Sequence, residues 1–226
     1  MAKTSNPKRA RGRPRQDVLN RDRVLAEALA LLDREGPDAL TMRHLAGVLN
    51  VSPMALYNHV RSKKDLLSSV AEHLVGQVEF SSDHRDWRER IRICFRRLRG
   101  VILAHPGALW LMDSVEEAPL AVFSPLEVTL AALHEAGLTG EPALKSYFLL
   151  ANFTLGQVSY EVRGPSKTLD PATALASGRL QGAGFEHIER AIAFEHWDFD
   201  SAFEFGLSAI IAGLEQIGVD AARRAE

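Results

Sequence analysis

The segment from Thr41 to Lys64, TMRHLAGVLNVSPMALYNHVRSKK, constrains the fold more than any other part of this chain. The capping residue Thr41 can open a first short helix. The apolar positions of that helix fall at helical spacing: Met42, Leu45, Ala46 and Leu49. Asn50 ends it, Ser52 caps a second helix, and Pro53 stands in the second helix's first turn, where a missing N–H costs nothing. Helices this short need neighbours to hold them. The segment therefore predicts two short helices joined by a tight turn, a unit that can enter the major groove of DNA.

Charge is distributed unevenly along the 226 residues. Residues 1–64 hold 13 Lys and Arg against 6 Asp and Glu, a balance of +7. The remaining residues hold 14 basic and 23 acidic side chains, a balance of −9. A small basic unit attached to a larger acidic one indicates that only the first part meets a polyanion.

The first 16 residues are basic, without an acid or an aromatic side chain. Such a segment cannot bury enough surface to fold alone. It predicts a flexible arm that contacts phosphates or lies in a minor groove, and Arg11-Gly12-Arg13-Pro14 resembles the hook that AT-rich minor grooves accept. The alternative is a solubilising tail or an expression remnant.

Helical periodicity continues through the rest of the chain, and no stretch alternates with the two-residue period of a strand. Apolar stripes, caps and Gly/Pro breaks predict helices over these ranges: 17–35, 62–80, 86–104, 124–137, 142–162, 186–194 and 201–217. Residues 163–183 are rich in Gly, Pro, Ser and Thr and predict a loop. The chain is thus predicted to be all-α. Its predicted parts are an arm over 1–16, a helix-turn-helix domain over 17–64, and a larger helical domain over 65–226 with a connector helix over 62–80.

Three features of the larger domain bear on function. The helix over 142–162 is apolar around most of its circumference, which predicts burial on several sides. The break at His105-Pro106-Gly107 allows the segments beside it to shift. Four arginines repeat at helical spacing in the helix over 86–104: Arg88, Arg92, Arg96 and Arg99. They lie outside the basic unit, so we expect a solvated face or ion pairs with distant acids in preference to DNA contacts.

Several classes of protein are disfavoured. A lone cysteine, Cys94, excludes an internal disulfide and a multi-cysteine zinc site. The eight histidines do not fall at metal-ligand spacing, and no catalytic fingerprint is present, so we expect no enzyme, catalytic residue, metal or cofactor. No apolar run reaches the ~18 residues of a membrane span. A cytoplasmic protein without a membrane partner is the expectation.

Residues Leu29–Leu67 closely match the DNA-binding signature of a known family. Phe153–Gly156 and Phe203–Leu207, with Ile211–Leu214, look like the sensor domain of the same family's founding member. The chain thus resembles the tetracycline-repressor (TetR) family of bacterial transcription regulators. The resemblance implies a ligand-sensing C-terminal domain and a homodimer through the helices at about 142–162 and 201–217. A two-fold dimer would place its recognition helices about 34 Å apart on a near-palindromic operator.

The resemblance also implies DNA-contact positions, which are Thr41, Arg43, Pro53, Met54, Tyr57, Asn58, His59 and Lys63. Tyr57, His59 and Lys63 would hold phosphates. Arg43 would read a guanine, and Pro53 and Met54 would contact thymine methyl groups. For Tyr57 and His59 the alternative is a packing role.

The expected ligand pocket is mostly apolar, and its candidate residues are Cys94, Leu98, Met112, Thr129, Phe148, Asn152 and Tyr160. Each of them could instead be a core residue. The positions that hold magnesium–tetracycline in the family's founding member correspond here to Glu79, Cys94, Met112, Thr129 and Tyr160. Magnesium requires oxygen ligands, so Cys94 and Met112 argue against that signal. A small hydrophobic molecule held by one or two hydrogen bonds fits better.

The sequence therefore predicts a ligand-responsive transcriptional regulator, a repressor that a small hydrophobic molecule releases from a palindromic operator. The ligand would move the break at 105–107 and swing the connector. The alternative is an architectural DNA-binding protein without a sensor, against which the large apolar C-terminal part argues.

Overall fold

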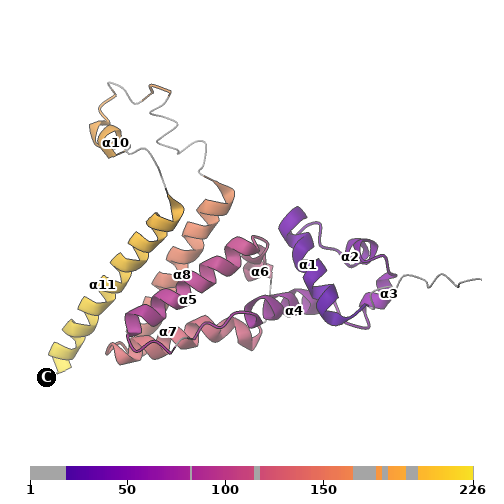
Figure 1. Cartoon of the computed structure of the whole chain (residues 1–226), viewed down its shortest axis with the longest axis horizontal. Helices are drawn as coiled ribbons and strands as arrows, with labels where there is room; N and C mark the ends of the chain where they lie inside the picture. The colour runs from indigo at the N-terminus through magenta and orange to yellow at the C-terminus, as the bar shows by residue number, and fades with distance from the viewer. Residues whose placement is uncertain are drawn as a thin grey trace, which may run out of the picture.

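The structure, a computed structural model, describes residues 19–81, 83–114, 118–164, 177–179, 183–191 and 198–225. Within these residues every regular element is a helix and none is a strand, so the all-α prediction is confirmed. Figure 1 shows an elongated molecule with α1 to α3 at one end, α8 and α11 at the other, and α4 between. The predicted arm over 1–16 and most of the predicted loop over 163–183 lie outside the described residues.

The N-terminal unit consists of three helices, α1 (Arg21–Glu35), α2 (Met42–Val48) and α3 (Pro53–Leu56). Each begins at a side-chain cap: Asn20, Thr41 and Ser52 accept a hydrogen bond from the third residue beyond. Helix α1 therefore starts a few residues later than predicted. Leucines from all three helices are buried in one core, which holds two helices that are too short to persist alone.

The connector is α4 (Lys63–Gly76), and its start was predicted correctly. The Ser62 hydroxyl accepts a hydrogen bond from the Asp65 N–H at 3.1 Å, and the Asp65 carboxylate accepts one from the Arg61 N–H at 2.6 Å. The predicted end near Phe80 is wrong, because the helix stops at Gly76. Phe80 instead lies buried in the core of the C-terminal domain.

The C-terminal domain contains the remaining helices, which are α5 (Trp87–Ala104), α6 (Ala108–Ser114), η1 (Leu120–Phe123), α7 (Ser124–Glu135), α8 (Gly140–Arg163), α10 (Glu186–Ala191) and α11 (Phe199–Ala225). Its core lies among α5, α7, α8 and α11. Helices α8 and α11 approach closely where the Phe153 and Phe203 rings stack at 5.6 Å between centroids. A Cβ at Gly206 would collide with the far end of the Phe153 ring, so a larger residue at this crossing would force the ring to move.

The turn between α2 and α3 depends on Asn50, which has a left-handed backbone with φ of 56°. Among non-glycine residues, asparagine tolerates this conformation best, whereas a β-branched side chain is strained there. We expect Asn50→Val to lower the free energy of unfolding by about 1–2 kcal/mol, and Asn50→Gly to leave it nearly unchanged. Urea unfolding of the two variants measures the difference. Equal stabilities would show that the turn does not impose this backbone.

Candidate nucleic-acid interface and ligand pocket

The predicted recognition element is a single turn of α-helix followed by a turn over residues 57–59. The His59 and Val60 N–H groups both donate to the Leu56 carbonyl, at 2.8 and 3.0 Å, which keeps the turn compact. Met54 is 72 % exposed and Tyr57 is 45 % exposed. Two large, neighbouring side chains that are exposed to solvent on a well-packed unit indicate a contact surface.

The other predicted DNA-contact residues lie at the edges of the same unit. Pro53, Asn58 and Arg43 are exposed, and Lys63 is the exposed first residue of α4. Thr41 is also exposed, and its hydroxyl already accepts the His44 N–H at 3.1 Å as the cap of α2. The hydroxyl of Thr41 can still donate, so the cap and a phosphate contact are compatible.

His59 is half-buried, and its carbonyl is held by a residue that the sequence reasoning missed. Arg21, at the start of α1, donates to the His59 carbonyl at 3.4 Å and to the Ser69 hydroxyl at 2.7 Å. Arg21 thus braces the recognition turn against the connector. Only the tertiary fold brings positions 21, 59 and 69 together, so no local pattern could have identified this role.

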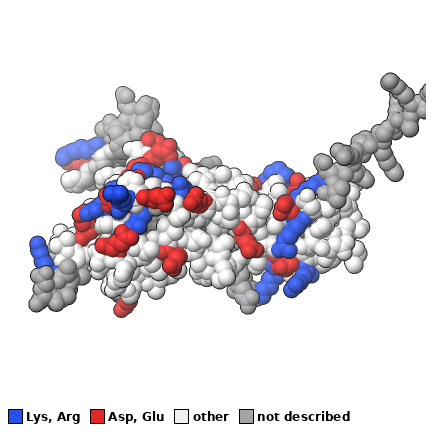
Figure 2. All heavy atoms as spheres, turned by 60° about the horizontal axis from the view of Figure 1, so that its bottom comes forward, with Lys and Arg blue, Asp and Glu red and all other residues white. Residues whose placement is uncertain are grey.

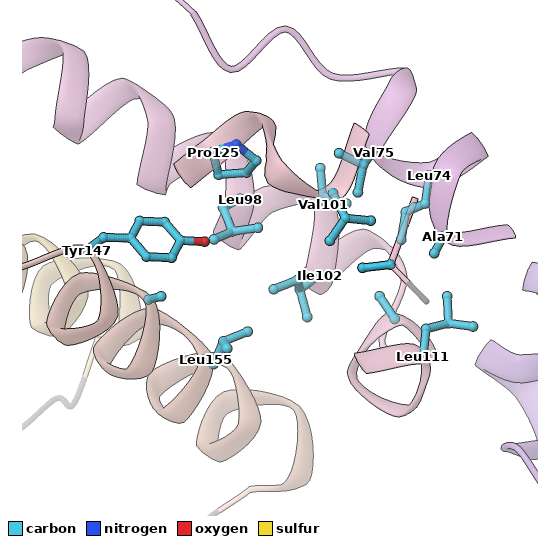
Figure 3. Close-up of a pocket in the computed structure, with 14 residues that line it drawn as sticks. Ala71, Leu74, Val75, Leu98, Val101, Ile102, Leu111, Pro125, Tyr147 and Leu155 are labelled. Carbon is cyan, nitrogen blue, oxygen red and sulfur yellow. The ribbon is translucent and has the colours of Figure 1, made fainter. Parts of the chain in front are cut away.

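A cavity of about 220 Å³ lies between the two ends of the molecule. Figure 3 shows its walls, which come from the connector and from the C-terminal domain. The lining residues are Ala71, Leu74 and Val75 of α4, Leu98, Val101 and Ile102 of α5, Ala108 and Leu111 of α6, Ala118, Val122 and Pro125 near α7, and Tyr147, Ala151 and Leu155 of α8. Cavities of this size can hold a ring-sized apolar molecule.

Tyr147 supplies the one side-chain polar atom among the described lining residues. Its hydroxyl points towards Leu98 across the cavity (Figure 3), and it forms no hydrogen bond to another described residue. Burial raises the pKa of Tyr147, so the phenol stays neutral and can donate a hydrogen bond. A ligand with one hydrogen-bond acceptor would satisfy this donor.

The structure divides the predicted ligand residues into separate places. Leu98 lines the cavity. Cys94 and Thr129 are fully buried beside each other, 3.9 Å apart, in the core instead of the cavity wall. Burial raises the pKa of the Cys94 thiol to about 11, which makes it an unreactive core residue. Met112 belongs to α6, but its side chain lies outside the described part of the structure.

This cavity is not lined by the other three predicted ligand residues, which are Phe148, Asn152 and Tyr160. Phe148 is 51 % exposed, and Asn152 and Tyr160 are exposed as well. Successive helical residues are 100° apart, so Tyr147 and Ala151 face the cavity while the residue after each faces away. The predicted ligand residues and the cavity therefore involve the same helix, α8, but different sides of it.

Four cavity-lining residues also belong to the hydrophobic core of the N-terminal unit: Ala71, Leu74, Ala108 and Leu111. They come from the connector α4 and from α6, which pack against each other. A molecule that fills the cavity would press on the packing of the N-terminal unit without an intermediate layer of residues.

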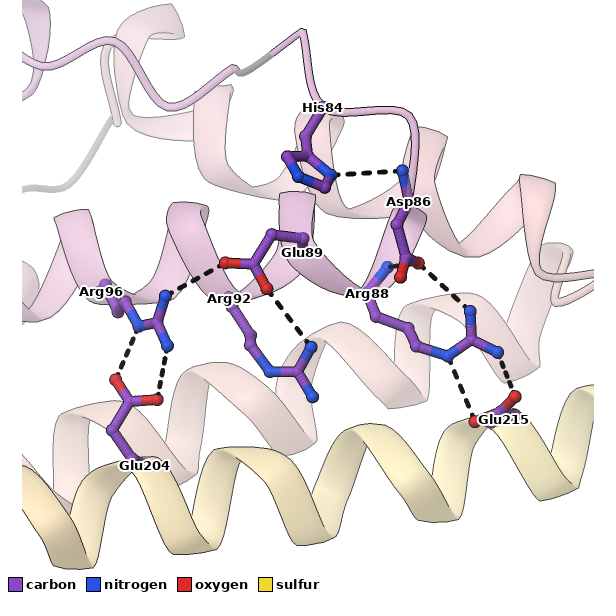
Figure 4. A network of polar contacts seen from close by, with 8 residues as sticks. All are labelled: His84, Asp86, Arg88, Glu89, Arg92, Arg96, Glu204 and Glu215. Carbon is purple, nitrogen blue, oxygen red and sulfur yellow. Dashed lines mark hydrogen bonds and ion pairs between the residues drawn. The ribbon is translucent and has the colours of Figure 1, made fainter.

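The arginines of α5 form ion pairs, as predicted (Figure 4). Arg96 donates to Glu204 of α11 at 2.6 and 2.8 Å, and Arg88 pairs with Glu215 of the same helix. The hydrogen bonds from Arg96 lower the pKa of Glu204. Figure 2 shows Lys/Arg and Asp/Glu side chains next to each other over this end of the molecule. Arg88 and Arg96 are therefore paired with acids and link α5 to α11.

The helix-turn-helix unit has an exposed face, and its core shares residues with the wall of a cavity in the helical body. This arrangement defines a class of protein, the helix-turn-helix transcriptional regulators. Residues 24–70 match the family model described as bacterial regulatory proteins, tetR family, and residues 81–217 match the tetracyclin repressor-like C-terminal domain. The chain belongs to the tetR family, whose members are transcriptional regulators and not enzymes.

Similar proteins agree with this assignment. The tetracycline repressor protein class A from transposon 1721 of Escherichia coli is 33 % identical, with 84 % of this chain and 88 % of the relative aligned. The crystal structure of the Streptomyces coelicolor TetR family protein ActR in complex with actinorhodin superposes with a TM-score of 0.71 at 30 % identity, covering 89 % of this chain and 99 % of ActR. A structure of BioQ with its double-stranded DNA operator gives a TM-score of 0.59 at 26 % identity, covering 88 % and 99 %.

Proposed function

We propose that this protein is a repressor that binds a near-palindromic operator as a homodimer and leaves it when a small, mostly apolar molecule fills the cavity. The wall shared by the cavity and the N-terminal core carries the proposal. A ligand that prefers an expanded cavity shifts α4 and α6, and the recognition elements move with them. The ActR complex with actinorhodin and the BioQ complex with DNA support both halves of this function by analogy.

The proposed DNA contacts follow the exposed face of the N-terminal unit. Arg43 reads a guanine edge, and Met54 contacts a thymine methyl group together with Pro53. The phosphate contacts come from Thr41, Tyr57, Asn58, His59 and Lys63. The basic arm over 1–16 adds contacts in the minor groove.

The proposed dimer forms through α8 and α11. Both helices expose large apolar side chains, which are Leu144, Phe148, Leu149, Tyr160, Val162, Phe205, Ile217 and Val219. Among the described helices, one is long and apolar enough to span a membrane by length and composition. It is α11 over Phe199–Val219, with a mean hydropathy of 1.3. That helix buries Phe203 and Leu207 against the domain core, which fits a helix packed between two protein surfaces. A second copy of the same face covers the exposed residues by two-fold symmetry.

The proposed ligand is uncharged. No described residue of the cavity wall is charged. A charged ligand would be buried there without a partner among the described lining residues, which costs several kcal/mol. A neutral molecule with an acceptor for the Tyr147 hydroxyl has no such cost.

The pocket is tested by filling it. A phenyl ring needs roughly the space of a 150 Å³ cavity, so Ala151→Phe should occupy most of the 220 Å³ present. We expect this variant to weaken binding of the neutral dye N-phenyl-1-naphthylamine at least tenfold, measured by fluorescence titration. Asn152→Ala, on the next helical position, should change the dye affinity less than twofold. The reverse pattern would place the ligand on the other side of α8.

The repressor assignment is tested by selecting bound fragments from genomic DNA with the purified protein. A repeated near-palindrome whose affinity exceeds that of random DNA at every salt concentration supports it. The alternative, an architectural DNA-binding protein, would select no sequence.

A further inference from the structure

One carboxylate joins the N-terminal unit to the break between α5 and α6. Asp33, near the end of α1, accepts a hydrogen bond from the Gly107 N–H at 2.8 Å through Oδ1. Its Oδ2 lies 2.9 Å from Nδ1 of His105. A carboxylate only accepts, so this Nδ1 carries the proton and donates. Asp33 thus holds a side chain and the main chain of the same break.

The contact is close as well as polar. A Cβ at Gly107 would lie 2.8 Å from both Oδ1 of Asp33 and Cβ of Leu32. Contacts under 3 Å do not occur for real Cβ atoms, so α1 can approach the break only because residue 107 is glycine. The end of α1 and the start of α6 are therefore seated directly on each other.

The position of this contact relates it to the cavity. Gly107 immediately precedes α6, and Ala108 and Leu111 of α6 lie in both the cavity wall and the N-terminal core. A ligand that displaces α6 must either carry α1 with it or break both hydrogen bonds of Asp33. Leaving the half-buried carboxylate unpaired is unfavourable, so carrying α1 along is preferred.

We infer that Asp33 is a positioning residue that makes the N-terminal unit follow α6, so that cavity and DNA face are coupled through α1 as well as through the connector. This inference rests on the proposed ligand-responsive function. It adds to that function a polar link between α1 and the start of α6, beside the connector and the apolar contacts that α6 makes with the N-terminal core.

The coupling between DNA and cavity is measurable in both directions, because linkage is reciprocal. The experiment titrates the full-length protein with N-phenyl-1-naphthylamine, with and without a saturating operator duplex chosen from genomic fragments. The ratio of the two dye affinities is the coupling factor. Allosteric coupling factors are typically about 5- to 150-fold. We expect Asp33→Ala to reduce this factor at least threefold, while the dye affinity of the DNA-free protein changes less than twofold.

Two further variants separate positioning from folding. Asp33→Asn keeps an acceptor for the Gly107 N–H and should retain an intermediate coupling factor, whereas Gly107→Ala should separate the two helices and lower the factor as Asp33→Ala does. Asp38→Ala, an exposed acid of the same unit, is the matched control and should keep the full factor. If Asp33→Ala and Gly107→Ala both keep the coupling factor of the unaltered protein, the positioning role of Asp33 is overturned and the proposed function stands. A factor of one in the unaltered protein would overturn the proposed function itself.

Discussion

Replacing Phe205 by glutamate is expected to convert the proposed dimer into a monomer and to weaken operator binding at least 100-fold. Phe205 is 79 % exposed on α11, next to Gly206, where α8 and α11 cross. Covering an aromatic side chain removes about 150–250 Å² from water, and two-fold symmetry counts it twice. At about 25 cal/mol per Å², complete burial of the two rings contributes roughly 7–12 kcal/mol to association. In the dimer, each introduced carboxylate would also be buried against the other subunit.

Sedimentation velocity at micromolar concentration measures the first effect, and an operator gel shift measures the second. Leu120→Glu is the matched control, because Leu120 is 87 % exposed in η1, away from α8 and α11. This control should remain a dimer with unchanged operator affinity. A Phe205→Glu protein that still sediments as a dimer would remove α11 from the interface.

The sequence predicted most of the helices, because their caps and apolar spacing are local, but it predicted neither α6 nor η1. Asp86 caps α5 and Ser62 caps α4, as the side-chain pattern indicates. Where tertiary packing decides, the prediction failed. Phe80 fits the apolar stripe of the connector, but the helix ends at Gly76 and the ring enters another core.

The candidate site was predicted unevenly for the same reason. The exposure of Met54 and Tyr57 agrees with a recognition element, because that element is short and its amphipathic pattern is clear. On α8, which is apolar on several sides, the sequence does not tell the side that lines the cavity from the side that is exposed. Neither the brace of Arg21 nor the double contact of Asp33 has a local signal, since their partners lie tens of residues away.

Removing the side chains of Arg43 and Tyr57 together is expected to weaken operator binding about 100- to 1000-fold. A bidentate arginine–guanine contact contributes about 1–3 kcal/mol of discrimination, and loss of a phosphate contact adds to it. Arg43→Ala alone should relax specificity at one base pair of each half-site. Lys63→Ala should instead weaken all sequences alike and reduce the salt slope by about one. Fluorescence anisotropy on the selected operator and on single-base variants, at several salt concentrations, distinguishes the two patterns.

Arg34→Ala is the matched control for charge, because Arg34 lies at the far end of α1 beside Glu27 and Glu35. It removes the same charge from the same unit, so a purely electrostatic interface would respond to it as to Arg43→Ala. A specific interface responds only to Arg43, because direct readout needs a guanidinium at one place on a base edge. If both variants lose the same affinity on every sequence, Arg43 acts as a phosphate contact and base readout must come from α3. If the double variant binds with full affinity, the exposed face of α2 and α3 is not the DNA-binding surface.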